Sequence, residues 1–324
     1  MPSSHGQGPP GPGEFPGSPP GIPPGTIIFG PKGNCTLDIC PVEYSVYGYR
    51  PTLAVNIAFI ILFAIAAGIH LYQGIRWKSW FFMACILVGC VSAILGYIGR
   101  VMMYYNPFNF SAFMLQITCV TTTPVYFCAA IYITLAKIIV YFSPNLSRCR
   151  PSFFYWFFIP CDFFSLVIQA AGGALSTTSK GTSQQGVNLA LAGLSFQVFT
   201  ICTFCGLMGD YLYRYFRSGN AAGTKLGWKL YTFFTFLSLA ILLITMRCTY
   251  RLAELHDGYS GYMVRDEGLF IGLEGVLILL SVYALMLGHP GPVFKTADRK
   301  QISLENRGYE LRDDPSSNTS VHGI

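Results

Sequence analysis

The chain has 324 residues, of which 52% are hydrophobic and only 11% are charged, and its formal net charge is +6. Soluble domains carry about 25% charged residues, so this composition excludes an ordinary soluble domain and predicts an integral membrane protein. The net charge is too small to indicate nucleic-acid binding, and we expect no nucleic-acid partner.

Residues 1–48 are predicted to form a tail that is disordered and, on the orientation argued below, extracellular. Proline and glycine dominate its first part, which cannot bury enough apolar surface to fold. The tail ends in a small cysteine loop, in which we expect a disulfide between Cys35 and Cys40 if this side is extracellular. Asn34-Cys35-Thr36 is also a candidate glycosylation sequon, usable on that side alone.

Residues 49–291 contain seven apolar segments, each long enough to cross a bilayer. Because a backbone in lipid must satisfy its own hydrogen bonds, we predict an all-α integral membrane bundle of seven transmembrane helices. The segments are placed at about Leu53–Tyr72, Trp80–Arg100, Phe110–Tyr141, Ser152–Leu175, Val187–Leu212, Trp228–Tyr250 and Gly268–Gly288.

Two local features are predicted within these segments. Pro124 should kink the third helix, with neighbouring threonines bonding the freed carbonyls. Small residues should allow close helix contacts, and the candidates are Gly172, Gly173, Gly193, Gly206 and Gly209.

The basic residues predict the orientation of the bundle. Most lysines and arginines outside the spans lie in the loops after the first, third and fifth helices and in residues 292–324. The positive-inside rule then places the N-terminus outside and the C-terminus in the cytosol. Residues 292–324 are polar and predicted to form a disordered cytosolic tail, and Asn109-Phe110-Ser111 becomes a second candidate sequon facing outward.

Polar side chains inside the spans predict a site. A charge near the bilayer centre costs at least about 2.5 kcal/mol, so it should face the bundle interior and be paired. The expected pairs join Arg100 or Arg247 to Asp162 or Glu274. We predict a polar substrate-binding cavity that opens toward the outer side. Its predicted lining residues are Asn56, Arg100, Asp162, Gln169, Gln197, Arg247, Glu254 and Glu274.

An alternative interpretation needs no ligand. Buried polar pairs can fix helix register as interhelical contacts, and Arg100, Arg251 and Glu267 lie close enough to helix ends to reach the interface. His70 and Lys137 lie near the cytosolic ends of their helices, where we expect them to snorkel or sit at the interface.

Several function classes are disfavoured by missing motifs. The chain lacks the G-x-x-x-x-G-K-[ST] phosphate loop and the G-x-S-x-G serine elbow. His70 and His289 are predicted on the opposite side of the membrane from His256, so they cannot form a zinc site. We therefore predict no catalytic residues, no metal, no cofactor and no enzymatic activity. The third and seventh helices also lack the D-R-Y-like and N-P-x-x-Y signatures of G-protein-coupled receptors.

Seven ordered sequence blocks carry a family resemblance: Tyr49–Leu53, Gly96–Arg100, Ala129–Tyr132, Gln169–Gly173, Gly193–Gln197, Arg247–Arg251 and His289–Gly291. With these blocks the chain resembles the fungal RTA-like family of lipid-translocating exporters, over about residues 45–292. The chain departs from the family pattern at Ala93, where an acidic residue is usual, at Cys248, where serine is usual, and at Glu274, where aspartate is usual.

The resemblance implies a fungal plasma-membrane protein that translocates or exports amphipathic lipid-like molecules, such as sphingoid bases and sterol-like toxins, in lipid or drug stress. Its partners would be membrane lipids and an amphipathic small molecule, and the oligomeric state stays open. A cationic headgroup would bind Asp162 or Glu274. The alternative function is a seven-helix receptor or stress sensor that acts indirectly on lipid homeostasis.

Overall fold

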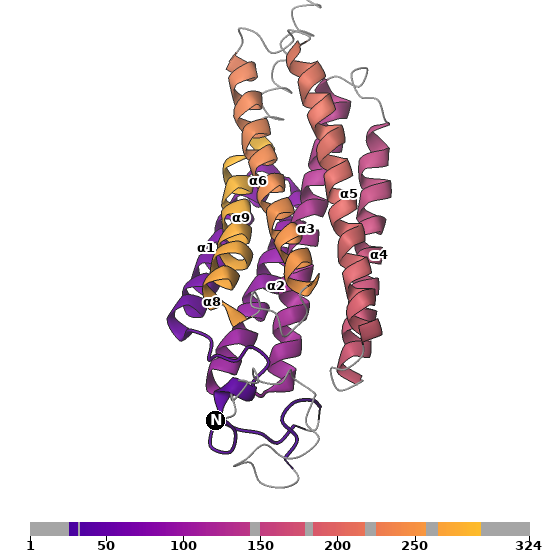
Figure 1. The fold of residues 1–324 in the computed structure, drawn as a ribbon. Helices are drawn as coiled ribbons and strands as arrows, with labels where there is room; N and C mark the ends of the chain where they lie inside the picture. The colour runs from indigo at the N-terminus through magenta and orange to yellow at the C-terminus, as the bar shows by residue number, and fades with distance from the viewer. Residues whose placement is uncertain are drawn as a thin grey trace, which may run out of the picture.

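The computed structural model describes residues 26–292, except residue 32 and residues 143–149, 179–183, 218–224 and 257–264. The secondary structure of this described part is helical throughout (Figure 1). Its elements are η1 (Val42–Tyr44), α1 (Leu53–Trp77), α2 (Trp80–Tyr105), α3 (Phe110–Phe142), α4 (Pro151–Thr178), α5 (Gln184–Arg217), α6 (Lys225–His256), α8 (Glu267–Leu269), η3 (Phe270–Val276) and α9 (Leu277–Leu287). Both predicted disordered tails fall mainly outside the described residues.

Seven helices are long and apolar enough to span a membrane, which confirms the predicted all-α fold. They are α1 to α6 and the continuous run of α8, η3 and α9, which covers Glu267–Leu287. The fifth and sixth helices extend beyond their predicted apolar cores, because polar turns continue each helix at both ends. As a result, α6 continues to His256, and the charged residues that follow its apolar core are still part of the helix.

The helices form two flanks around α3, whose span is the most buried of the seven. Figure 1 shows α4 and α5 side by side at one flank, with α1 and α9 at the other. The α4–α5 contact is close because it uses glycines. A Cβ placed at Gly172 would lie 2.4 Å from a backbone nitrogen of α5, and one at Gly193 would lie 2.9 Å from a backbone oxygen of α4.

The prediction of close helix contacts is wrong for the three remaining glycines. In the described part of the chain, no neighbouring atom lies within 4 Å of the same Cβ position at Gly173, Gly206 or Gly209. They lie on helix faces that no neighbouring helix approaches closely. Sequence alone could not separate these glycines from Gly172, because the distinction depends on which helix face meets a partner.

Pro124 lies inside α3 as predicted, but the freed carbonyl has a different partner. Proline lacks the N–H that would bond the carbonyl four residues earlier, which belongs to Val120. Arg247 of α6 donates to this oxygen, with 3.0 Å between Nη2 and Val120 O. The threonine hydroxyls of Thr122 and Thr123 instead donate to Cys119 O, at 3.1 and 2.8 Å.

One end of the bundle is covered by the described residues between 26 and 52, which we call the cap. Phe29 packs edge-on against Phe113 at the start of α3, with ring centroids 5.4 Å apart. Cys35 and Cys40 are joined in a disulfide, with their Cα atoms 5.9 Å apart. The cap therefore packs on the bundle through aromatic contacts such as the one between Phe29 and Phe113.

Candidate functional site

Arg247 of α6 and Glu274 of η3 form an ion pair in the bundle interior, as the sequence predicts. The distance between Arg247 Nη2 and Glu274 Oε1 is 2.7 Å, and each side chain is only 1% exposed. Arg251, one helical turn further along α6, places Nη1 at 3.6 Å from the other carboxylate oxygen of Glu274 and at 2.6 Å from Glu254 Oε2. Two arginines therefore share Glu274, and Glu254 completes the group.

The wide π-helical winding of η3 carries Glu274 to this position. In a π-helix the hydrogen bonds run to the fifth residue along, and such turns are frequent at functional sites. The run starts at an N-cap, where Asp266 Oδ1 accepts from the backbone nitrogen of Gly268 at 2.8 Å. Gly275 lets the wide turn approach its neighbours, since a Cβ there would lie 2.5 Å from the ring of Phe59.

Arg100 is fully buried at the capped end of α2 and pairs with Glu267, outside the predicted pairings. Its Nη2 lies 3.5 Å from Glu267 Oε1 and donates to the Tyr49 hydroxyl at 3.1 Å. Its guanidinium also lies over the ring of Phe270, 3.8 Å from the centroid, which is a cation–π contact. Burial raises the pKa of Tyr49 despite the opposing effect of Arg100, so the phenol stays neutral.

Thr52, which precedes α1, connects the cap to Glu267. Its backbone nitrogen donates to Glu267 Oε1 at 2.7 Å and its hydroxyl donates to Oε2 at 2.8 Å. Asn56, a predicted site residue, donates from Nδ2 to the Thr52 carbonyl at 2.7 Å. Asn56 therefore stabilises the first turn of α1 and contacts the charged residues through Thr52.

Two groups of ion pairs, that of Arg100 and that of Arg247 with Arg251, together form what we call the capped-end charge network. Three guanidinium groups face three carboxylates, so the formal sum is zero. Its members are Arg100, Arg247, Arg251, Glu254, Glu267 and Glu274.

Asp162 lies in different surroundings, where α4 meets α3 and α5. Its Oδ2 accepts from the Tyr132 hydroxyl at 2.9 Å, and its Oδ1 lies 3.1 Å from the Thr200 hydroxyl. The Tyr132 ring packs against Phe204, with centroids 4.4 Å apart, so the environment is largely apolar. Asp162 is 1% exposed, and no Lys, Arg or His side chain of the described residues forms an ion pair with it.

Gln169 and Gln197 extend this group along the α4–α5 contact. Gln169 Nε2 donates to Gln197 Oε1 at 2.9 Å, and the Thr200 hydroxyl donates to Gln197 O at 2.8 Å. We call the set of Tyr132, Asp162, Gln169, Gln197 and Thr200 the α4–α5 polar cluster.

The eight predicted site residues thus divide between two enclosed groups. The hydrogen bonds and ion pairs described above stay within each group. Among the described residues, these contacts do not join all eight in one group, and the charged side chains of the capped end are buried in contacts with each other. The capped-end charge network holds Arg100, Arg247, Glu254 and Glu274, with Asn56 beside it, and the α4–α5 polar cluster holds Asp162, Gln169 and Gln197.

Sequence reasoning missed several members of these groups. Tyr132 and Thr200 supply the hydroxyls around Asp162, and Tyr49 supplies one to Arg100. A signal existed for Thr200, which follows Gln197 by three residues and so shares its helix face. No comparable signal marks Tyr132, because it stands in an apolar run whose neighbouring helices the sequence does not reveal.

The structure corrects the predicted position of His70, which lies at the opposite end of the bundle. It was expected at the membrane interface, yet it is 1% exposed and its Nε2 lies 3.1 Å from Val282 O of α9. His289, after α9, packs against Phe82 and accepts from the backbone nitrogen of Gly291 at Nδ1, at 3.0 Å. Burial, with a smaller contribution from nearby His70, lowers the pKa of His289 to about 4.

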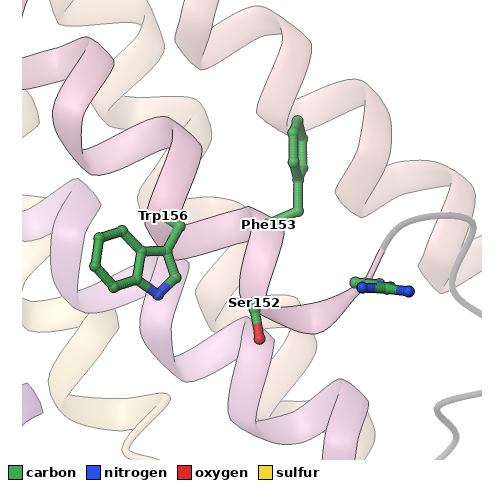
Figure 2. Close-up of a pocket in the computed structure, with 4 residues that line it drawn as sticks. Ser152, Phe153 and Trp156 are labelled. Carbon is green, nitrogen blue, oxygen red and sulfur yellow. The ribbon is translucent and has the colours of Figure 1, made fainter.

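Neither group coincides with the hollow shown in Figure 2. Arg150, Ser152, Phe153 and Trp156 line this hollow at the start of α4, and Trp156 is largely exposed. It contains none of the candidate site residues and lies on a surface that faces outward. Within the described part of the chain, no three His, Cys, Asp or Glu side chains converge as a metal site.

Comparison with known proteins identifies the family. A family model described as RTA1 like protein matches residues 86–297. The chain belongs to this family. It is also similar to the sphingoid long-chain base transporter RSB1 of Saccharomyces cerevisiae (strain ATCC 204508 / S288c), with 31% identity over 283 residues, which cover 76% of this chain and 74% of the relative.

Two further relatives agree with this assignment. The probable lipid transporter atnI of Emericella nidulans is 25% identical over 281 residues, covering 78% of this chain and 70% of the relative. Protein RTM1 of Saccharomyces cerevisiae is 27% identical over 205 residues, covering 63% of this chain and 65% of the relative. No solved structure matches the chain. The resemblance predicted from the seven sequence blocks is therefore confirmed, and the chain is a multi-pass membrane protein of this family.

Proposed function

We propose that this chain is a non-enzymatic transporter that moves cationic amphiphiles, of the sphingoid-base kind, across or out of the plasma membrane of a fungal cell. Its role would be resistance to lipid or drug stress. The names of two relatives, a sphingoid long-chain base transporter and a probable lipid transporter, support this substrate class. A sphingoid base carries an ammonium headgroup on a long apolar tail, so its site needs a negative charge beside lipid.

The observation that carries the proposal is the difference between the carboxylates. Glu274 is already neutralised by Arg247 and Arg251, so an incoming cation would have to displace an arginine. Asp162 has hydroxyl partners and no ion pair with a described basic side chain. A buried carboxylate of this kind gains most from a cationic ligand, because charge-assisted hydrogen bonds in an apolar environment are strong.

The surface of α4 next to Asp162 suits an alkyl tail. Phe163, Phe164 and Val167 follow Asp162 in sequence, and their side chains are exposed on the outside of the bundle, where lipid would surround them. A ligand whose ammonium binds Asp162 can therefore keep its chain along α4 without entering the core. The charged groups of the capped-end network need no part in this contact.

Transport by proteoliposomes tests the proposal. Asp162→Asn keeps the size of the side chain and removes its charge, so efflux of a labelled long-chain base should fall about tenfold or more, equivalent to about 1.4 kcal/mol of binding. Asp210→Asn is the matched control, because Asp210 pairs with Arg214 on the part-exposed end of α5, away from the polar cluster. Full transport by Asp162→Asn at equal protein amount would overturn the assignment.

The receptor or sensor alternative predicts a different result. A sensor would pass its signal through cytosolic segments such as residues 293–324, which lie outside the described part of the chain. Removing them should abolish the stress response of a sensor. A transporter should keep its flux in proteoliposomes, where no signalling partner is present.

A further inference from the structure

The hydroxyl of Thr200 has two acceptors and a single hydrogen. Its Oγ1 lies 2.8 Å from Gln197 O and 3.1 Å from Asp162 Oδ1. A hydroxyl donates one hydrogen bond and accepts up to two. When Thr200 donates along the shorter contact to Gln197, its oxygen faces Asp162 as an acceptor, and the contact to Asp162 then needs a hydrogen from the carboxyl group.

A proton on Asp162 Oδ1 completes this arrangement. Asp162 donates to Thr200, Thr200 donates to Gln197 O, and Tyr132 donates to Asp162 Oδ2. Each of these three hydroxyl or carboxyl hydrogens then has an acceptor. When the proton leaves, rotation of the Thr200 hydroxyl lets it donate to the carboxylate instead. The site therefore accommodates both protonation states with no movement of heavy atoms.

The charges around Asp162 favour exchange over a permanent ion pair. Among the described residues, the titratable side chains that interact electrostatically with it are Tyr132 and Cys128 of α3, Cys161 of α4 and Cys248 of α6. None of them is basic. Without a fixed cation the negative charge of Asp162 must be balanced by something mobile, because an uncompensated buried charge is unfavourable.

We propose that Asp162 is an exchange site at which a proton and the ammonium group of the transported amphiphile alternate. This inference rests on the proposed function and adds a coupling ion to it. In the resting state the carboxyl group holds the proton on Oδ1. When the ammonium binds, it forms an ion pair with the carboxylate, the O–H bond breaks, and one proton leaves to water.

The exchange keeps the formal charge of the site at zero in both states. A neutral acid is replaced by a carboxylate–ammonium pair, so neither state leaves an unbalanced charge inside the bundle. Each cation that binds on one side releases one proton there. Transport of the amphiphile is thereby coupled to movement of a proton in the opposite direction.

Proton release and infrared spectroscopy on the purified full-length protein test the inference. The probes are dodecylamine hydrochloride and dodecyltrimethylammonium, whose charge cannot change with pH. In weakly buffered solution, binding should release about one proton per protein, as the balance of the exchange requires. The difference spectrum should lose the C=O stretch of a protonated carboxylic acid, and Asp162→Asn should abolish both signals.

Two variants assign the signals to this network. Tyr132→Phe removes the donor to Asp162 Oδ2, so the lost C=O band should appear at a shifted frequency. Asp210→Asn should leave both signals unchanged, because this carboxylate pairs with Arg214. Dodecanol, which has the same tail and no charge, should release no proton.

The outcomes separate the exchange from the proposed function. If the two cationic probes bind to the wild type, bind weakly to Asp162→Asn and release no proton, the exchange is wrong and the proposed ammonium site stands. If neither probe binds, or both bind equally to wild type and Asp162→Asn, the proposed function fails at this site and the exchange fails with it.

Discussion

Arg247 bonds the carbonyl of Val120, the acceptor that Pro124 leaves without its helical donor. The same Nη2 atom that lies 3.0 Å from Val120 O lies 2.7 Å from Glu274 Oε1. One guanidinium thus donates to the carbonyl that lost its helical partner in α3 and also pairs with the carboxylate of η3. This explains why a proline in the middle of the most buried span is compatible with a well-packed helix.

Breaking the Arg247–Glu274 pair on one side should destabilise the protein more than removing both partners. Arg247→Met leaves a buried carboxylate with Arg251 alone, and Glu274→Met leaves Arg247 with only a carbonyl. Each single change should cost about 3–5 kcal/mol, because a buried charge loses its partner. The double variant should recover part of this loss. The measurement is the apparent melting temperature in detergent.

The outcome of this cycle distinguishes a paired contact from independent contributions. The loss of stability in the double variant should be smaller than the sum of the two single losses by more than about 0.5 kcal/mol. If the double variant loses the sum of the two single losses, the two side chains do not act as a pair. Asp210→Met is a suitable comparison, since its ion pair with Arg214 is partly exposed and should contribute at most about 1 kcal/mol.

Gly172 and Gly173 should respond in opposite ways to the same substitution. A Cβ at Gly172 would lie 2.4 Å from a backbone nitrogen of α5, and backbone cannot move aside as a side chain can. Gly172→Ala should therefore force α4 and α5 apart and cost about 1–3 kcal/mol. Gly173 has open space at this position, so Gly173→Ala should be neutral or slightly stabilising in a helix.

The comparison is made by thermal unfolding and by the yield of folded protein after detergent extraction. Both variants carry the same added methyl group, so a difference between them reports the helix contact itself. Equal loss of stability at the two positions would contradict the close approach of α4 and α5. Gly193→Ala should resemble Gly172→Ala, because its Cβ would lie 2.9 Å from a backbone oxygen.

The sequence predicts those features that depend on one helix at a time. Apolar length predicts the seven spans, and the spacing of Arg247, Arg251 and Glu254 on one face predicts a charged face of α6. The partner of Arg247 was narrowed to Asp162 or Glu274, because both acidic residues lie well inside apolar segments, and the structure selects Glu274. These features follow from local periodicity and from the cost of burying a charge.

Features that depend on which helices meet could not be predicted. The partner of Arg100 is Glu267 of α8, and the same carboxylate also accepts from Thr52 of the cap. The hydroxyls around Asp162 come from two other helices. Many arrangements of seven helices share the same apolar pattern, so a sequence shows that Asp162 needs partners without showing which side chains supply them.

His289 should make stability depend on pH between about 6.5 and 4. Burial lowers its folded pKa from the model-compound value of 6.5 to about 4. In this window the unfolded chain binds a proton that the folded protein does not, so stability falls as the pH falls. The contribution is complete above about pH 6.5, and roughly 3 kcal/mol at most is lost by pH 4. The geometry agrees, since Nδ1 accepts from Gly291 and has no room for a proton.

Apparent melting temperatures measured from pH 7 to pH 4 check this prediction. His289→Gln keeps an acceptor and a donor in one side chain but does not titrate, so the decrease on acidification should be smaller than in the wild type. His256→Gln, at the exposed end of α6, should keep the wild-type decrease. A decrease that is identical in His289→Gln would exclude His289 as its source.

Asn34 should carry a glycan if the N-terminus faces the outside. Its side chain is exposed in the cap, while that of Asn109 is half-buried and its Oδ1 accepts from the backbone nitrogen of Ala112 at 3.1 Å. We therefore expect Asn34 to be the main acceptor. Endoglycosidase treatment should increase the electrophoretic mobility of the wild type, and Asn34→Gln should abolish most of this shift.

Thr36→Ala is the matched control for the loss of the glycan. It destroys the sequon while leaving Asn34, whose Oδ1 accepts from the backbone nitrogen of Ile27 at 2.8 Å, in place. Both substitutions should give the same mobility, because the sequon needs its threonine. In the sequence, three of the seven spans separate Asn34 from the sequon Asn145-Leu146-Ser147, so the two sequons are predicted on opposite sides of the membrane. A glycan that persists in Asn34→Gln and disappears in Asn145→Gln would reverse the predicted orientation, and with it the direction in which the cap faces.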